Sequence, residues 1–201
     1  AHQIGTPLTS MMGWITLLKE KQKNDVSVLE IEKDIERLKV ITDRFSKVGS
    51  TPELSPRNLI ETLSNTVKYL QKRSSEHVQF TLDLPKKGII IPFNPELISW
   101  TLENLIKNAI DAMKGKGTLG IRVTEFDLHV EILISDTGTG MPKEIASKIF
   151  DPGFTTKSRG WGLGLSLAKR IVVDFHQGKI NVVKTALGKG TQFKIALNKT
   201  V

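Results

Sequence analysis

Residues 136–165, DTGTGMPKEIASKIFDPGFTTKSRGWGLGL, constrain the fold more than any other part of the sequence. The stretch contains two pairs of closely spaced glycines, Gly138/Gly140 and Gly162/Gly164. A strand pattern, VEILIS, comes before it, and a helical pattern, LSLAKRIVV, follows it. Glycine lets backbone N–H groups approach a ligand closely, and the first amides of a helix bind anions. The stretch therefore predicts a nucleotide or phosphate site with a mobile cover.

The composition excludes several classes of protein. Hydrophobic residues make up 39% of the chain and charged residues 25%, as is usual for a folded domain. The absence of cysteine excludes disulfides and thiolate metal sites and fits a reducing, cytoplasmic compartment. The net charge is +8, but the basic residues form no run of five or more, so we expect no nucleic-acid partner.

No apolar run approaches the roughly 20 residues that a membrane-spanning helix needs, so we expect no membrane contact in this chain. The sequence begins abruptly inside a helical pattern. We therefore expect it to be a fragment of a longer protein, which could itself be membrane-anchored.

The N-terminal quarter has the pattern of a helical hairpin. Apolar residues recur at helical spacing over residues 1–23 and 26–48, on either side of a turn at Asn24-Asp25. One hairpin cannot bury so broad an apolar surface, whereas two hairpins paired as a four-helix bundle can. We assign residues 1–50 to a dimerisation domain that forms a homodimer and residues 51–56 to a linker.

Residues 57–201 have the pattern of an α/β sandwich. Ser55-Pro56 predicts the start of a helix that runs to about Ser75. Strands are expected at 77–84, 89–92, 118–126, 129–135, 179–185 and 190–197, and further helices at 95–113 and 163–176. The predicted fold class is α+β, with the helical hairpin followed by a mixed five-stranded sheet and three helices.

Polar residues with two interpretations lie along the predicted helix 95–113. Asn104, Lys107, Asn108 and Asp111 share one helix face. They are either a solvated surface or the wall of a nucleotide site, in which Asn108 would hold Mg²⁺ and Asn104 and Lys107 would lie near phosphates. Asp136, at the end of a predicted strand, is either a turn former or the acceptor of a hydrogen bond from the amino group of adenine.

Five segments in order along the chain resemble the conserved boxes of the ATP-binding domain of sensor histidine kinases. They are NLIKNAIDAM, DTGTGMP, IFDPGFTTK, GWGLGLSLAKRIV and GKGTQFKIAL. The resemblance covers about residues 55–198 and implies the Bergerat-type fold that this family shares with gyrase-type topoisomerases, heat-shock chaperone ATPases and MutL. It also implies ATP and Mg²⁺ as cofactors, Asp136 on adenine, and a flexible lid between the glycine pairs.

The resemblance and the residue patterns together give a set of expected nucleotide-binding residues, in which Asn108 is the metal ligand. They are Asn104, Lys107, Asn108, Asp111, Asp136, Gly138, Gly140, Phe154, Thr155, Thr156, Lys157, Gly162, Leu163, Gly164, Leu165 and Thr191.

The N-terminal AHQIGTPLTSMM resembles the phosphoacceptor box of the same family, which implies that His2, Gln3 and Thr6 are the catalytic residues. His2 matches the phosphoacceptor, and Thr6 matches the residue that orients water in phosphatase activity. Gln3 stands where many relatives have an acid; an amide can orient the imidazole but cannot accept its proton. Pro7 either follows a Thr6 cap, which would leave residues 1–5 frayed, or lies inside a longer helix and kinks it.

The position four residues before Asn108 separates kinases from ATPases in this superfamily. The ATPase branch has a glutamate base there, whereas this chain has Asn104, and Glu103 would point about 100° away. We therefore predict a protein-histidine kinase that phosphorylates His2 with ATP and passes the phosphoryl group to a response-regulator receiver aspartate, and that could also act as a phosphatase. The alternative is a degenerate ATP-binding dimeric module with little kinase activity, which Gln3 favours; a mechanical ATPase is disfavoured by Asn104.

Overall fold

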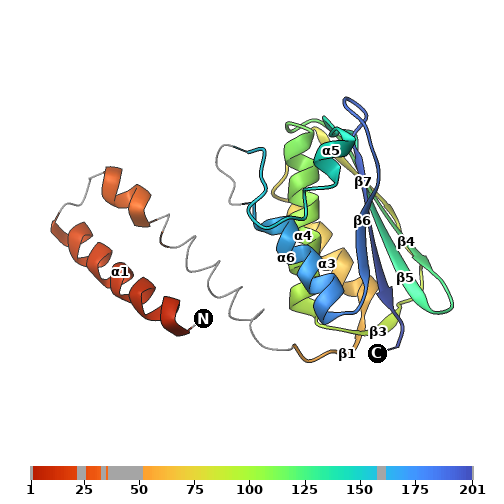
Figure 1. The fold of residues 1–201 in the computed structure, drawn as a ribbon, viewed down its shortest axis with the longest axis horizontal. Coiled ribbons are helices and arrows are strands. Elements are labelled where there is room, and N and C mark those ends of the chain that lie inside the picture. Colours follow the sequence, from red (N-terminus) through yellow and green to blue (C-terminus); the bar gives the residue numbers. More distant parts are fainter. Residues whose placement is uncertain (1, 22–25, 33–34, 36–51, 158–161, 201) are drawn as a thin grey trace. The chain divides into compact units, whose positions relative to one another are not determined.

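The structure is a computed structural model that describes residues 2–21, 26–32, 35, 52–157 and 162–200 (Figure 1). The chain separates into two compact units, Ala1–Pro52 and Glu53–Val201. This division falls inside the predicted linker, whereas the roles that we assigned to the two parts stay predictions.

The N-terminal unit contains helix α1 (His2–Lys21) and a second helical segment at residues 26–32. Ile15 of α1 forms a buried cluster with Val28 and Ile35, and Lys19 forms an ion pair with Glu32 at 2.6 Å. These contacts join the two segments as a hairpin. Residues 36–48 of the second predicted helix lie outside the described residues.

Helix α1 settles the two alternatives for Pro7. It is continuous from His2, so Pro7 lies in its interior and the alternative start at Thr6 is wrong. Because proline has no backbone N–H, the carbonyl of Gln3 loses its usual partner in the helix.

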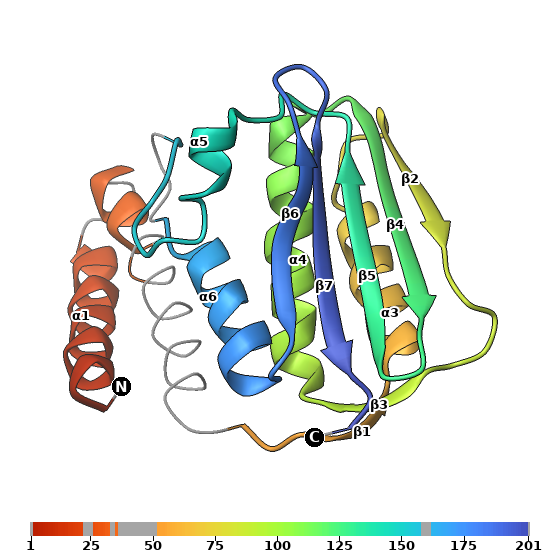
Figure 2. The ribbon, with the colours of Figure 1, turned by 45° about the vertical axis from the view of Figure 1, so that its right-hand side comes forward.

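The C-terminal unit is built on a five-stranded sheet with three helices on one face (Figure 2). Along the sheet the strands are β2 (Val78–Asp83), β4 (Gly117–Glu125), β5 (His129–Asp136), β7 (Thr191–Asn198) and β6 (Lys179–Thr185). Strands β2 and β4 run parallel, and the other neighbours are antiparallel. The covering helices are α3 (Leu59–Gln71), α4 (Pro95–Ala112) and α6 (Gly164–Arg170). The predicted mixed five-stranded sheet with three helices is confirmed.

Alternation along the central strands explains why the helices cover one face. On β5 every second residue is buried, from Val130 through Ile134 to Asp136, and β7 alternates in the same way. Leu102, Leu105 and Ile106 of α4 are fully buried. The apolar sides of the strands and helices therefore share one core, and Asp136 is the one carboxylate among its buried residues in the described part of the chain.

Residues 55–58 correct the prediction of a helix that begins at Ser55-Pro56. They form β1 (Ser55–Asn58), which pairs antiparallel with β3 (Ile90–Phe93) as a separate two-stranded sheet. Pro56 lies opposite Pro92 in this pair, so the two residues that lack an N–H face each other. Helix α3 begins at Leu59 instead, because the Asn58 side chain accepts hydrogen bonds from the amides of Ile60 and Glu61 at 3.1 and 3.4 Å.

Two further differences concern helices. A short helix, α5 (Lys143–Ala146), lies within the glycine-rich stretch and was not predicted. The helix expected over 163–176 is α-helical only over α6 and continues as a π-helical turn, η1 (Ile171–Phe175).

His176 joins the end of η1 to the start of α4. Its Nδ1 lies 2.7 Å from the Ile171 carbonyl oxygen, and its Nε2 accepts a hydrogen bond from the Asn94 amide at 3.1 Å. A carbonyl oxygen can only accept a hydrogen bond, and a backbone amide can only donate one. The imidazole ring of His176 is therefore neutral, with its proton on Nδ1. Asn94 in turn caps α4 by accepting from the Leu97 amide at 3.1 Å. Burial lowers the pKa of His176, and the hydrogen bond to Ile171 opposes this in part.

We therefore expect the contribution of His176 to the stability of the C-terminal unit to be lost as the pH falls. Because the pKa of His176 is lowered in the native state, the unfolded chain binds the proton more readily, and the stability contribution present above about pH 6.5 is lost below it. His176→Ala should reduce the free energy of unfolding by about 1–3 kcal/mol at pH 7.5, and by less at pH 5. Urea unfolding of both proteins at the two pH values measures this. An equal loss of unfolding free energy at the two pH values would contradict the prediction.

Candidate functional site

The carboxyl end of β5, the carboxyl end of α4 and the turn between β6 and β7 meet at one end of the sandwich (Figure 2). Backbone hydrogen bonds hold them together. The Thr139 amide donates to the Ala112 carbonyl of α4 at 3.0 Å, and the Gly188 amide of the turn donates to the Thr139 carbonyl at 2.8 Å. The segment after Asp136 is therefore held between a helix end and a hairpin turn.

Asp136 is a buried carboxylate with backbone partners. Its side chain is 7% exposed, and one oxygen accepts a hydrogen bond from the Gly138 amide at 2.8 Å. Burial raises the pKa of the Asp136 carboxyl, while hydrogen bonds from the Gly138 and Thr191 amides lower it in part. The desolvated charge is a strong acceptor for a ligand that brings a donor group.

The glycines near Asp136 are required for packing within the protein. A Cβ at Gly138 would lie 2.6 Å from the carbonyl carbon of Ala112. Gly140 has φ +59°, and a Cβ there would overlap the carbonyl oxygen of Ala186. These residues thus let the β5 end approach α4 and the β6–β7 turn, a packing role that we did not predict from the sequence.

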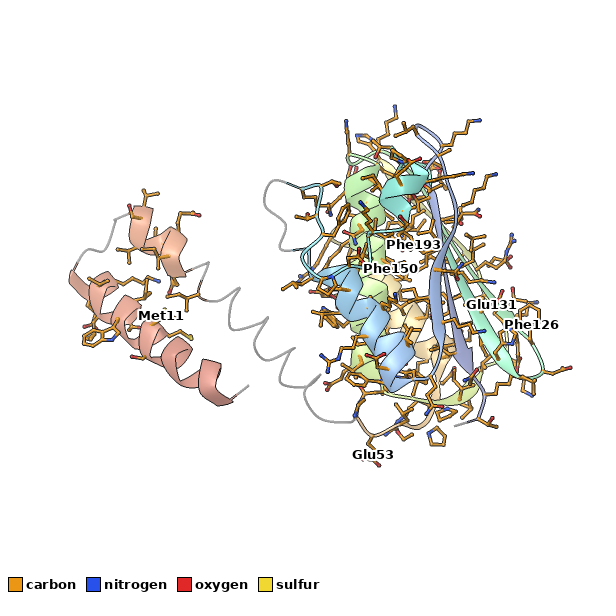
Figure 3. All side chains as sticks on the ribbon, viewed as in Figure 1. Met11, Glu53, Phe126, Glu131, Phe150 and Phe193 are labelled. Carbon is orange, nitrogen blue, oxygen red and sulfur yellow. The ribbon has the colours of Figure 1, made fainter. Side chains whose placement is uncertain are left out.

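Gly153 and Gly162 close the loop that includes residues 154–157. The Gly153 amide donates to the Gly162 carbonyl at 3.1 Å, and Gly162 has φ +64°, with no room for a Cβ against the backbone of Gly153. Before the loop, Phe150 packs edge-on against Phe193 of β7, with ring centroids 6.4 Å apart (Figure 3). Both ends of this loop are therefore anchored.

Lys157 connects this loop to the polar face of α4. Its ammonium donates to the Asn108 amide oxygen at 2.8 Å and to an Asp111 carboxylate oxygen at 2.7 Å. The Asn104 amide donates to the Gly164 carbonyl at 3.4 Å. Lys107 turns away from this group and pairs with Glu103 at 2.9 Å. The structure thus brings Asn104, Asn108, Asp111, Lys157 and Gly164 together and leaves Lys107 in a separate ion pair.

The remaining predicted residues lie around this group or in the other unit. Thr155 accepts a hydrogen bond from the Lys157 amide at 3.1 Å, and Thr156 is exposed. Phe154, Leu163 and Leu165 are half-buried, and Thr191 is buried. The side chains of His2, Gln3 and Thr6 lie outside the described part of the chain, although all three residues belong to α1.

Thr185 is a residue that sequence reasoning missed. It ends β6, and its hydroxyl contacts the amide of Met141, which follows Gly140, at 3.0 Å and the hydroxyl of Thr191 at 3.1 Å. A single threonine at a strand end carries no motif, so only the three-dimensional arrangement identifies it. In the part of the chain that the structure covers, no helix is long and apolar enough to cross a bilayer.

Glycine turns, a buried carboxylate and a polar helix face thus meet at one end of the α/β sandwich. Residues 94–201 match the family described as "Histidine kinase-, DNA gyrase B-, and HSP90-like ATPase". The match covers more than half of the chain, and the chain belongs to this family.

The chain is also similar to individual kinases in sequence and in structure. It is 30% identical over 203 residues to Sporulation kinase E of Bacillus subtilis (strain 168), covering 98% of this chain and 27% of that protein. A solved catalytic domain of the histidine kinase ThkA matches 74% of this chain and 97% of its own, with 29% identity and a TM-score of 0.68. ThkA in complex with the response regulator protein TrrA matches the whole chain and 60% of its own, with 25% identity and a TM-score of 0.70.

These matches confirm the predicted resemblance to sensor histidine kinases. The chain spans 27% of the length of Sporulation kinase E and 51% of the length of one sensor protein kinase WalK of Staphylococcus aureus.

The buried charge of Asp136 should reduce the stability of the nucleotide-free protein. Because the pKa of this carboxyl is raised in the native state, the folded protein binds its proton more readily, and stability falls as the pH rises above about 4. Asp136→Asn should therefore raise the free energy of unfolding by about 1 kcal/mol at pH 7, since the amide oxygen can still accept from Gly138. The measurement is denaturant unfolding of the two proteins.

Asp127→Asn, an exposed aspartate in the β4–β5 turn, is the matched control and should change stability little. A lower stability for Asp136→Asn than for the native protein would contradict the prediction.

Proposed function

We propose that the chain is the catalytic core of a sensor histidine kinase that binds ATP–Mg²⁺, autophosphorylates His2 and passes the phosphoryl group to a response-regulator aspartate. The observation that carries the proposal is the arrangement at the end of α4. Gly138, two residues after Asp136, packs against Ala112, which is one turn beyond Asn108 on α4, and Lys157 lies against Asn108 and Asp111. This arrangement offers an adenine acceptor beside a polar surface for phosphates.

Adenine recognition would rest on Asp136. Its desolvated carboxylate accepts from the Gly138 amide and has further acceptor capacity for the amino group of adenine. Guanine presents a carbonyl oxygen at the equivalent position, which would face a negative charge. The proposed preference is therefore for ATP over GTP.

The polar face of α4 would hold the phosphates and the metal. An amide oxygen and a carboxylate oxygen already accept the Lys157 ammonium, so this donor set suits a cation. The described residues contain no group of three or more histidine or acidic side chains that could hold a metal, and Mg²⁺ commonly takes its other ligands from water and phosphates. Asn108 would hold the metal, which when bound would neutralise phosphate charge, while Asn104 and Lys157 would bind phosphate oxygens.

His2 would act as the nucleophile of the transfer. A neutral ring nitrogen attacks the γ-phosphorus, so that an N–P bond forms as the bond to the bridging oxygen of ADP breaks. The proton on the other ring nitrogen must then leave, and the Gln3 amide cannot accept it. The proton would go to another base or to water, and Gln3 would orient the ring. Thr6 would orient water when the chain acts as a phosphatase.

The acceptor of the second transfer is proposed from a relative. The histidine kinase ThkA has been solved with the response regulator TrrA, and that structure matches this chain over its whole length. A receiver-domain aspartate is therefore the proposed acceptor here. We also propose a cytoplasmic location, where ATP is available.

Radiolabelled ATP tests the kinase proposal. The native chain should gain acid-labile label, His2→Ala should bind ATP but gain none, and Asn108→Ala should lose most of the label because the metal ligand is gone. His77→Ala, an exposed histidine before β2, is the control and should keep the label. Acid-labile label on His2→Ala would overturn the assignment of His2.

The same assay separates the kinase from the degenerate module. A native chain that binds ATP and stays unlabelled, with label appearing in Gln3→Glu, would favour the degenerate module. Acid-labile label on the native chain would exclude the degenerate module.

Exposed apolar residues on α1 support a homodimer. Ile15 is buried within the hairpin, whereas Trp14, Leu17 and Met11 are 63%, 51% and 42% exposed. At 100° per residue these three lie on one side of the Ile15 position, so the apolar face extends beyond what one hairpin covers. A second hairpin would cover this surface as a four-helix bundle.

Trp14→Asp should therefore shift the chain towards the monomer. A buried aromatic anchor commonly contributes about 2 kcal/mol or more to an interface, so the dissociation constant should rise at least about 30-fold. Analytical ultracentrifugation over a concentration series measures this. Leu128→Asp, which changes a residue 79% exposed in the other unit, is the control and should leave the mass unchanged. Equal dissociation constants for native protein and Trp14→Asp would count against the bundle.

A further inference from the structure

Thr185 lies at the centre of a hydrogen-bonded group that connects the two loops beside Asp136. Its hydroxyl accepts from the Met141 amide at 3.0 Å and lies 3.1 Å from the hydroxyl of Thr191. The carbonyl oxygens of Gly190 and Met141 lie 3.3 and 3.4 Å away as acceptors for its proton. One hydroxyl thus contacts the segment after β5 and the first residue of β7.

A β-bulge places this threonine in the site. Val182 pairs with Phe193, Lys184 with Gln192 and Thr185 with Thr191, so β6 has one extra residue between Val182 and Lys184. Without the bulge, Lys184 would lie opposite Thr191 and would point towards the buried side. The bulge therefore puts a short hydroxyl, in place of a long cation, beside Thr191.

The two loops held by Thr185 both contact Asp136. The Gly138 amide of the first loop donates to the Asp136 carboxylate at 2.8 Å, and the Thr191 amide of the second loop lies near enough to lower the pKa of this carboxyl. A Cβ at Gly190 would overlap the Asp136 carbonyl oxygen, so the turn that leads into β7 lies directly against the backbone of Asp136. The spacing of the two loops sets where the carboxylate lies and which of its lone pairs remains available.

We propose that Thr185 is a positioning residue of the nucleotide site, whose hydroxyl fixes the loops around Asp136 and thereby sets the preference for adenine over guanine. This inference rests on the proposed ATP site. None of the hydrogen bonds of the Thr185 side chain involves Asn104, Asn108 or Lys157. Thr185 therefore affects the part of the site that would bind the base and leaves unchanged the part that would bind the phosphates.

Thr185→Val and Thr185→Ser test the role of the hydroxyl. Valine keeps the shape and removes the hydrogen bonds, whereas serine keeps the hydroxyl. Thr185→Val should raise the Kd for ATP about 5- to 30-fold while weak GTP binding changes less than about twofold, so that the ATP/GTP preference falls. Thr185→Ser should restore the ATP affinity to within about twofold. Calorimetric titration with each nucleotide measures both constants.

Further readouts separate positioning from general destabilisation. In the nucleotide-free protein, hydrogen exchange at the Met141 and Gly138 amides should be faster in Thr185→Val, while amides in α3 should be unchanged. With saturating ATP, the rate of His2 labelling should be within about twofold of the native rate, because the phosphate end is intact. Thr124→Val, a threonine exposed on β4, is the matched control and should keep the native Kd for ATP.

The outcomes distinguish this proposal from the proposed function. ATP affinity unchanged in Thr185→Val, or ATP and GTP weakened by the same factor, would overturn the positioning role whatever happens at His2. A native chain that binds ATP but leaves His2 unlabelled would overturn the kinase assignment and leave the role of Thr185 supported. A native chain that binds no ATP would overturn both.

Discussion

The close contact of three backbone segments around Asp136 is the constraint on which the rest of the site depends. Gly138 lies against the end of α4, Gly140 against the β6–β7 turn, and Gly190 against Asp136 itself, each with no room for a side chain. Side chains are excluded from these contacts, so the positions of the segments are set by backbone shape and hydrogen bonds. The carboxylate can then be both buried and reachable, because backbone amides satisfy part of its charge and leave the remainder for a ligand.

The phosphate side of the site depends on charge. Lys157 lies with its ammonium on Asn108 and Asp111, and all three side chains come from surfaces open to water. Ion pairs of this exposure contribute little to stability, of the order of 1 kcal/mol or less. The contacts of Lys157 can therefore be replaced by a bound cation and phosphates with little loss of stability. The part of the site around Asp136, in contrast, is held by buried groups. The site therefore combines a fixed base end with an exchangeable phosphate end.

The sequence predicted most strands and helices of the C-terminal unit and the polar residues that share one face of α4. Alternation along residues 129–135 and 190–197 identified the central strands, and helical spacing placed Asn104, Asn108 and Asp111 on one face of α4. Residues 55–58 were predicted wrongly because a Ser-Pro helix start and an edge strand are equally compatible with that local sequence. The choice depends on pairing with β3, more than 30 residues away along the chain.

Three other features could not be predicted either, because local sequence patterns do not determine them. Lys107 could face either phosphate or Glu103, and helical spacing cannot decide between them. The role of Thr185 follows from a bulge in β6, which depends on the register with β7. The π-helical turn before His176 ends at a ring whose partner, Asn94, is 82 residues away.

The position of β7 has a consequence for the order in which the chain can fold. This strand, the last along the chain, pairs with β5, and Gly190 just before it packs against the Asp136 backbone, more than 50 residues earlier in the chain. Contacts of such sequence separation form late because their loop-closure entropy must be overcome first. During synthesis the polar face of α4 and the glycine turns emerge long before the strand that completes the site. A nascent chain that ends before β7 therefore has the site residues of α4 and of the glycine turns but lacks Thr191 and the strand register that arranges the site.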